Sequence, residues 1–175
     1  MLAPLVRRTW ALRGHTPELA QQQGKRQKVS IAGALWTPPR RDHLEWTFQA
    51  LVNDYFADEH VALFVEALLE EVGGRLVLVW DRGPIHRGEP FERLLAQHAG
   101  RLSLERLPPY APELNPVEPA WSWLKYSRLC NFAPHDAQEL QAAVLREMNS
   151  VCHHQPLLHG FWGASQLPLL RALLT

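Results

Sequence analysis

The chain has 175 residues, of which 46% are apolar and 21% charged, which is typical of one globular domain rather than a disordered or fibrous protein. Eighteen basic and eighteen acidic side chains cancel, so net charge does not indicate a nucleic-acid-binding protein. No apolar run approaches the roughly 18 residues that cross a membrane, the N-terminus lacks the order of a signal peptide, and two cysteines give no disulfide framework. A cytoplasmic protein is expected.

The N-terminal part of the chain is basic. Against the single acid Glu18, the first thirty residues contain Arg7, Arg8, Arg13, Lys25, Arg26 and Lys28. Such a segment can lie along a DNA phosphate backbone, but a solvated surface hairpin explains it equally well. We predict a short strand at 7–12 that pairs antiparallel with a strand at 28–35. A turn at 14–17 and the polar stretch QQQGKRQ lie between them.

The middle of the chain alternates strands and helices. Residues 44–52 are ambiguous between strand and helix. An apolar helical face predicts a helix at 58–72 that ends at Gly73-Gly74. The continuously apolar run at 76–80 predicts a strand buried on both faces. A helix at 90–98 and a strand at 101–105 follow, and strand, helix and strand with short links imply a parallel crossover.

The C-terminal part is predicted to be helical. Leu140, Val144 and Met148 are in register on a helix at 136–148, with Asp136 as its N-cap. The apolar tail at 157–174 is expected to pack against the rest of the chain. We therefore expect a single domain over 1–175, with residues 126–175 as a helical extension of it.

Two carboxylates form the candidate site. Asp81 ends the apolar strand, and Glu118 begins a helix within the stretch LPPYAPELNPVEPAWSWLK. Carboxylates at a strand end and in a helix's first turn can converge on a hard cation such as Mg²⁺ or Mn²⁺. Alternatively, Asp81 caps a turn and Glu118 forms a capping box with Asn115. Lys125 lies seven residues beyond Glu118 on the same helix face, where it can meet a phosphate or remain an ordinary solvated lysine.

These motifs resemble the second and third acidic motifs of a DDE transposase. The resemblance rests on Asp81 with His86 five residues later, and on PPYAPELNPVEPAW with Glu118 as its acidic residue. The 36 residues between Asp81 and Glu118 suit the insertion-sequence-630 type, which is related to mariner elements. RRTWALRGHTP and KVSIAGAL are also similar to segments of that family, so the resemblance runs from about residue 7 to residue 125.

The resemblance implies an α/β fold of the RNase H-like type, a mixed sheet flanked by helices, and two-metal phosphoryl transfer on DNA with Mg²⁺ or Mn²⁺. Asp81 and Glu118 would be the metal ligands, while His86, Asn115 and Lys125 are candidates for supporting or DNA-contacting roles. Arg82 stands where the family often has Asn. The family's first catalytic Asp precedes the RTW segment, so we expect it, its strand and an upstream helix-turn-helix region to lie before Met1.

The resulting hypothesis is a transposase fragment that is inactive alone and that pairs with an upstream fragment or a second copy on DNA. Two alternatives remain open, a non-catalytic module that completes or inhibits a full transposase and an RNase H-like nuclease. Asp42, Asp54 and Asp58 are available acids, but none matches the first motif. A zinc site is disfavoured because no zinc-binding pattern matches the spacing of Cys130, His135, Cys152, His153 and His154.

Overall fold

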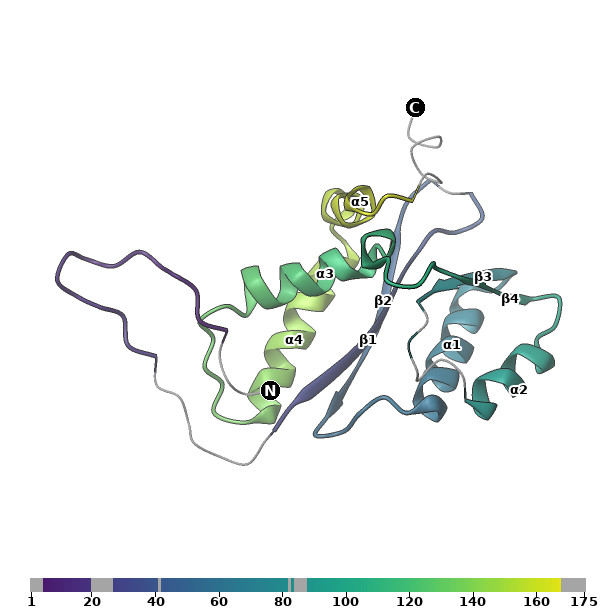
Figure 1. Ribbon diagram of the computed structural model, residues 1–175, viewed down its shortest axis with the longest axis horizontal. Coiled ribbons are helices and arrows are strands. Elements are labelled where there is room, and N and C mark those ends of the chain that lie inside the picture. Colours follow the sequence, from purple (N-terminus) through teal and green to yellow (C-terminus); the bar gives the residue numbers. More distant parts are fainter. Residues whose placement is uncertain (1–4, 20–26, 41, 82, 84–87, 168–175) are drawn as a thin grey trace.

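The computed structural model describes residues 5–19, 27–40, 42–81, 83 and 88–167. Within these ranges the fold is mixed α/β, as expected, with two two-stranded sheets and helices packed on both (Figure 1). Arg82, His86, most of the QQQGKRQ connection and the end of the apolar tail lie outside the described residues. The elements, in chain order, are β1 (Val29–Trp36), β2 (Glu45–Val52), α1 (Asp58–Val72), β3 (Leu76–Trp80), α2 (Glu89–Gln97), β4 (Leu102–Arg106), α3 (Val117–Trp123), α4 (Ala137–Cys152) and α5 (Gln155–Ala164).

The first sheet is an antiparallel pair of β1 and β2, in a register that runs from Val29↔Val52 to Trp36↔Glu45. The predicted pairing of 7–12 with 28–35 is therefore wrong, and the ambiguous segment 44–52 contains the true partner strand. The alternation of apolar and polar residues in this segment explains why it forms the partner strand. Trp46 and Phe48 face the core between the polar residues Glu45, Thr47 and Gln49, whereas residues 7–12 are exposed.

The second sheet is the parallel pair of β3 and β4 that the sequence predicts, with Leu76 opposite Leu102 and Trp80 opposite Arg106. Helices α1 and α2 cover one of its faces, where Trp80 packs on Phe91 with ring centroids 4.6 Å apart. The predicted burial of β3 on both faces is wrong, because Val77 is 60% and Val79 44% exposed. This second face of β3 is therefore largely exposed.

Two hydrophobic core clusters hold the fold together. The first joins β1 and β2 to α3, α4 and α5, around Leu44, Trp46, Ala120, Leu124, Val144, Met148, Val151, Leu158 and Phe161. The second joins β3 and β4 to α1 and α2, around Val65, Leu68, Leu69, Leu76, Phe91, Leu94 and Leu102. Strand β1 contacts both, because Ile31 and Leu35 pack on the first cluster while Ala34 and Trp36 pack on the second.

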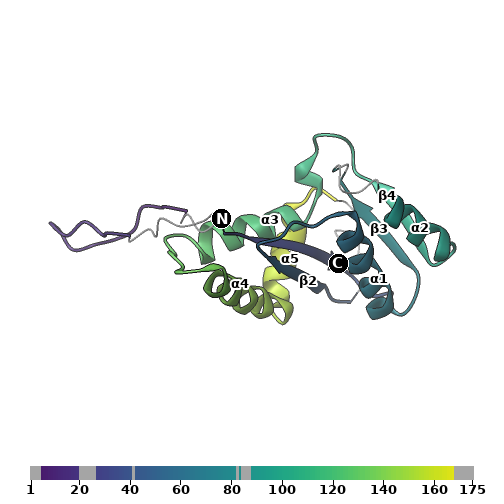
Figure 2. The ribbon, with the colours of Figure 1, turned by 90° about the horizontal axis from the view of Figure 1, so that it is seen from below.

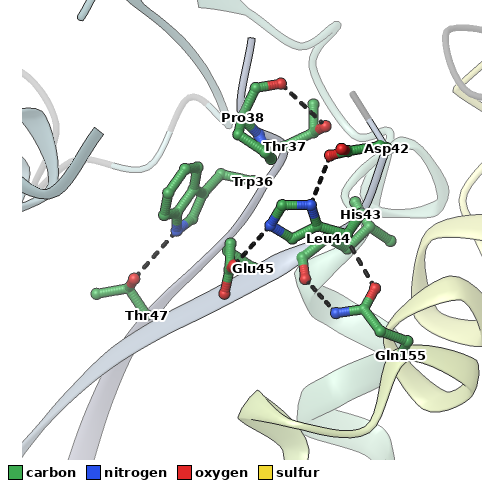
Figure 3. A network of polar contacts seen from close by, with 9 residues as sticks. All are labelled: Trp36, Thr37, Pro38, Asp42, His43, Leu44, Glu45, Thr47 and Gln155. Atoms are coloured by element: carbon green, nitrogen blue, oxygen red, sulfur yellow. Dashed lines mark hydrogen bonds and ion pairs between the residues drawn. The ribbon is translucent and has the colours of Figure 1, made fainter. Parts of the chain in front are cut away.

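The helix boundaries follow from local signals. Gly73 ends α1 in the left-handed conformation with φ 64°, and Asp136 caps α4 by accepting the Glu139 N–H at 2.8 Å. At the start of α5, the Gln155 side chain bonds both backbone groups of Leu44 (Figure 3), at 3.0 Å to its N–H and 2.7 Å to its carbonyl. This contact fixes the C-terminal helix to the start of β2. Among the helices of the described ranges, none has the length and apolar character of a membrane span.

A buried carboxylate ties α4 to the turn that follows α3. Glu147 accepts hydrogen bonds from Arg128 Nε at 2.6 Å and from Arg146 Nε at 3.3 Å. Burial raises the pKa of the Glu147 carboxyl, but the hydrogen bond and charge of Arg128, with those of Arg146, outweigh it and hold the pKa below the ordinary 4.5.

Replacing Glu147 with Gln is expected to destabilise the protein near neutral pH by about 1 kcal/mol, because the charge-assisted bond to Arg128 is lost. The folded-state pKa is lowered, so the carboxylate's stabilisation is complete above the unfolded value of 4.5 and is lost as pH falls through the folded value. Urea unfolding from about pH 7 to about pH 3 should show the two proteins converging in acid. Glu105→Gln, at an exposed strand position, is the matched control, and an equal loss there would contradict this role.

Candidate active site

Asp81 lies directly after β3, at the C-terminal end of the parallel strands. Its Oδ1 accepts the Gly83 N–H at 2.8 Å, so it does cap the following turn, and its side chain is nevertheless exposed. The preceding Trp80 carbonyl accepts the Leu107 N–H at 2.9 Å. The chain that leads to the second candidate residue therefore starts beside Asp81, at the edge where ligands gather in open α/β sheets.

The connection from Leu107 to Glu118 is held by its own hydrogen bonds. A 3₁₀ turn spans Pro112–Leu114, and the Asn115 N–H donates to the Pro112 carbonyl at 3.0 Å. The Asn115 side chain accepts the Val117 N–H at 3.2 Å. The predicted capping box needs the Asn115 N–H as donor to Glu118, but Pro112 takes that donor. Asn115 alone caps the helix, and the Glu118 carboxylate is exposed at its first turn.

Helix α3 buries one side and exposes a row of polar residues on the other. Ala120 is 0% and Leu124 2% exposed, both in the first core cluster. Glu118, Ser122 and Lys125 are exposed at spacings of four and three residues, which places them on one helix face. Lys125 thus lies on the side of α3 that carries Glu118, as the sequence predicts.

A π-helical turn at Leu124–Arg128 follows α3, closed by the hydrogen bond from the Leu129 N–H to the Leu124 carbonyl at 2.9 Å. π-Helical turns are rare in proteins, and those that occur are often found at functional sites. The Arg7 guanidinium lies 5.2 Å from the centroid of the Tyr126 ring, and its Nη1 donates to the Tyr126 carbonyl at 3.0 Å. Sequence reasoning missed this contact, because only the fold brings residues 119 positions apart together.

Asp42, another available acid, contacts a histidine in the structure. Asp42 and Glu45 both bond the His43 ring, at 2.6 and 2.8 Å, where the connection from β1 enters β2 (Figure 3). The hydrogen bond from His43 lowers the pKa of Asp42, and that same bond raises the pKa of His43. Within the described ranges, no group of three or more His, Cys, Asp or Glu side chains could hold a metal ion.

A family model described as DDE superfamily endonuclease matches residues 2–141, about four fifths of the chain. The chain belongs to the DDE superfamily of endonucleases. The match contains both Asp81 and Glu118 and extends beyond the range of the resemblance at both ends. The comparison with curated proteins gives no match. Endonucleases of this superfamily act on DNA and in general use divalent metals.

The donor chemistry of this DDE endonuclease chain fits such a metal in kind. Asp81 and Glu118 are exposed oxygen donors, which hard cations prefer over nitrogen or sulfur. Their number is smaller than two closely spaced cations require, because about three carboxylates are needed to offset the repulsion between the ions. His86, which accompanies Asp81 in the resemblance, lies outside the described residues.

Proposed function

We propose that this chain is the C-terminal part of the catalytic domain of an insertion-sequence transposase, of the insertion-sequence-630 type. Its reaction is the cleavage of DNA strands at element ends and their transfer to target DNA. Asp81 and Glu118 bind the divalent ions, and Lys125 contacts a DNA phosphate. Membership of the DDE endonuclease superfamily and the exposed carboxylates at the ends of β3 and at the start of α3 support this proposal.

The arrangement of the strands supports a second part of the proposal, that a further strand completes the sheet. In the described part of the chain, β1 pairs only with β2, and β3 only with β4. The two sheets still touch, since Ala34 and Trp36 of β1 pack on the second core cluster together with Leu78 of β3. Two neighbouring strands with a core in common but no hydrogen-bond ladder between them offer edges that a further strand can pair with.

A strand supplied from outside residues 1–175 would join the two pairs into one five-stranded mixed sheet of the RNase H-like type. It would bring the third carboxylate to the edge where Asp81 lies. The source is an upstream fragment of the same transposase or another copy of it. Without that strand the described residues offer Asp81 and Glu118 as ligands, and we expect no cleavage by the chain alone.

In the completed site, divalent ions would supply Lewis-acid polarisation of the scissile phosphate. The chain's own residues bind and orient. Asp81 and Glu118 provide the negative charge that holds the ions, and the row from Glu118 to Lys125 lies where the DNA backbone would pass. The Asn115 cap fixes the first turn of α3 and with it the backbone that carries Glu118.

The test is nicking of supercoiled plasmid in Mn²⁺, by the chain alone and by the chain mixed with the polypeptide encoded immediately upstream. We expect no nicking by the chain alone and clear nicking by the mixture. Nicking by the chain alone would contradict the proposal that the chain needs a further metal ligand. If neither preparation nicks DNA but the chain inhibits a full-length transposase, it is a non-catalytic module. Cleavage by the mixture without preference for inverted-repeat ends would indicate a general nuclease instead.

A further inference from the structure

Residues 6–19 form an arm that projects from the molecule at the side opposite the β3–β4 sheet, as both views of the ribbon show (Figures 1 and 2). Every residue of the arm is exposed, including Trp10 at 100% and Leu12 at 79%. The arm bends at Gly14, which has φ 87°, where the His15 N–H donates to the Leu12 carbonyl at 2.9 Å. Val6 is 74% exposed as well, and exposed apolar side chains gathered on one short segment mark an interaction site.

The root of the arm is fixed to the turn that ends α3. Leu5 forms a parallel bridge with Cys130, and its carbonyl accepts the Asn131 N–H at 2.9 Å. The Asn131 side chain accepts the Arg7 N–H at 2.8 Å, and Arg7 also donates to the Tyr126 carbonyl. The arm therefore has a defined starting point on the π-helical turn, and its position follows that of α3.

The charge of the arm favours a polyanionic partner. Residues 5–19 contain the arginines Arg7, Arg8 and Arg13 and a single acid, Glu18. Arg7 is engaged at the root, so Arg8 and Arg13 are the cations available on either side of Trp10. Arginine beside an exposed aromatic ring suits nucleic acid, since the guanidinium binds phosphate and the ring stacks on a base.

The position of the arm favours DNA that also reaches the candidate active site. Helix α3 extends from the neighbourhood of the β3–β4 sheet to the root of the arm (Figures 1 and 2), and Glu118, Ser122 and Lys125 are exposed along it. From Glu118 to Tyr126 the axial rise is about 12 Å at 1.5 Å per residue, which corresponds to roughly three or four base pairs of duplex. DNA held at Glu118 thus meets the arm a few base pairs away.

We propose that the arm is a DNA clamp, in which Arg8 and Arg13 bind backbone phosphates that flank the cleavage point and Trp10 stacks on an exposed base. This inference rests on the proposed function, because it takes DNA as the substrate, and it assigns to the arm a binding role separate from the metal ligands. Binding through the arm needs no metal and no third carboxylate.

The test is the affinity of the whole chain for a labelled duplex with a single-stranded end, measured by fluorescence anisotropy without metal over a series of salt concentrations. Two lost phosphate contacts should lower the slope of log affinity against log salt by about 1.8 in Arg8→Gln/Arg13→Gln. The control Arg75→Gln/Arg93→Gln removes the same charge at exposed positions before β3 and on α2, and should leave the slope unchanged. Equal slopes in wild type and the arm variant would overturn the clamp.

Trp10→Ala gives a second readout. DNA should quench the tryptophan fluorescence of the wild type and of the control variant, and most of this quenching should be lost in Trp10→Ala. Quenching that persists would overturn the stacking role. If the arm variants lose self-association and keep their DNA affinity, the arm binds a second copy and the clamp is wrong, while the proposed function stands. Absence of DNA binding by the wild type would overturn both.

Discussion

Replacing Asp81 with Asn is expected to lower metal-dependent DNA cleavage by the completed protein by about a hundredfold or more, since loss of one ligand removes several kcal/mol of charge stabilisation. The variant should fold normally. Asp81 is exposed, and the amide oxygen of Asn can still accept the Gly83 N–H that the carboxylate accepts at 2.8 Å. The measurement is the initial rate of plasmid nicking by the chain together with its upstream segment, in Mn²⁺ and in Mg²⁺.

Glu118→Gln should behave in the same way, and Glu113 provides the matched control. Glu113 lies five residues earlier in the 3₁₀ turn Pro112–Leu114, is also exposed, and belongs to the same connection. Glu113→Gln removes one negative charge from that neighbourhood and should retain most of the activity. If Glu113→Gln and Glu118→Gln lose activity equally, the effect is one of local charge, and the assignment of Glu118 as a ligand is wrong.

The elements around the candidate site were predictable because their signals are local. An apolar run that ends at Asp81 and a proline-rich connection that ends at Glu118 each fix a boundary within a few residues. The parallel pairing of β3 and β4 followed from the helix between them. What the sequence proposes beyond this, that Asp81 and Glu118 bind metal together, stays a prediction, because it depends on groups that the described residues do not bring together.

Strand partners and covered faces were harder to predict, because they depend on distant residues. The alternation in residues 7–12 is too weak to choose a partner, and the segment instead projects as part of the arm. An apolar run such as LVLVW does not show which of its faces is covered: α1 and α2 cover the side of Leu76, and the described chain leaves Val77 exposed. The hydrogen bonds between the Gln155 side chain and the Leu44 backbone join residues 111 positions apart, and neither local sequence predicts them.

The same dependence on distant contacts decides the role of Gly33, in the middle of β1. A Cβ at this position would lie 2.8 Å from Cη2 of Trp121 on α3 and 2.9 Å from Cη2 of Trp46 on β2. These two rings meet edge to face with centroids 5.6 Å apart. Since Trp46 is 4% exposed and belongs to the first core cluster, the rings have little room to move. Gly33 therefore sets the distance at which α3 packs on the first sheet.

Gly33→Ala is expected to destabilise the protein by about 1–3 kcal/mol, because the added methyl group overpacks this contact by more than the stiffer backbone stabilises. For a chain of this size the melting temperature should fall by roughly 2–12 °C. Gly160→Ala is the matched control. It lies in α5 with nothing within 4 Å of a new Cβ, so the same substitution should stabilise by about 0.5–1 kcal/mol. Thermal unfolding of both variants tests whether the two substitutions change the stability in opposite directions.

The cause can be separated from a general intolerance of β1 by a double-mutant cycle. Trp121→Phe shortens the ring that approaches Gly33 on the α3 side, so Gly33→Ala should cost less in that background than in the wild type. An equal loss of stability in both backgrounds would show that contact with Trp121 is not what destabilises Gly33→Ala. Because Glu118 precedes Trp121 by only three residues on α3, a coupled cost would also mean that the packing of Gly33 positions the candidate ligand relative to β1.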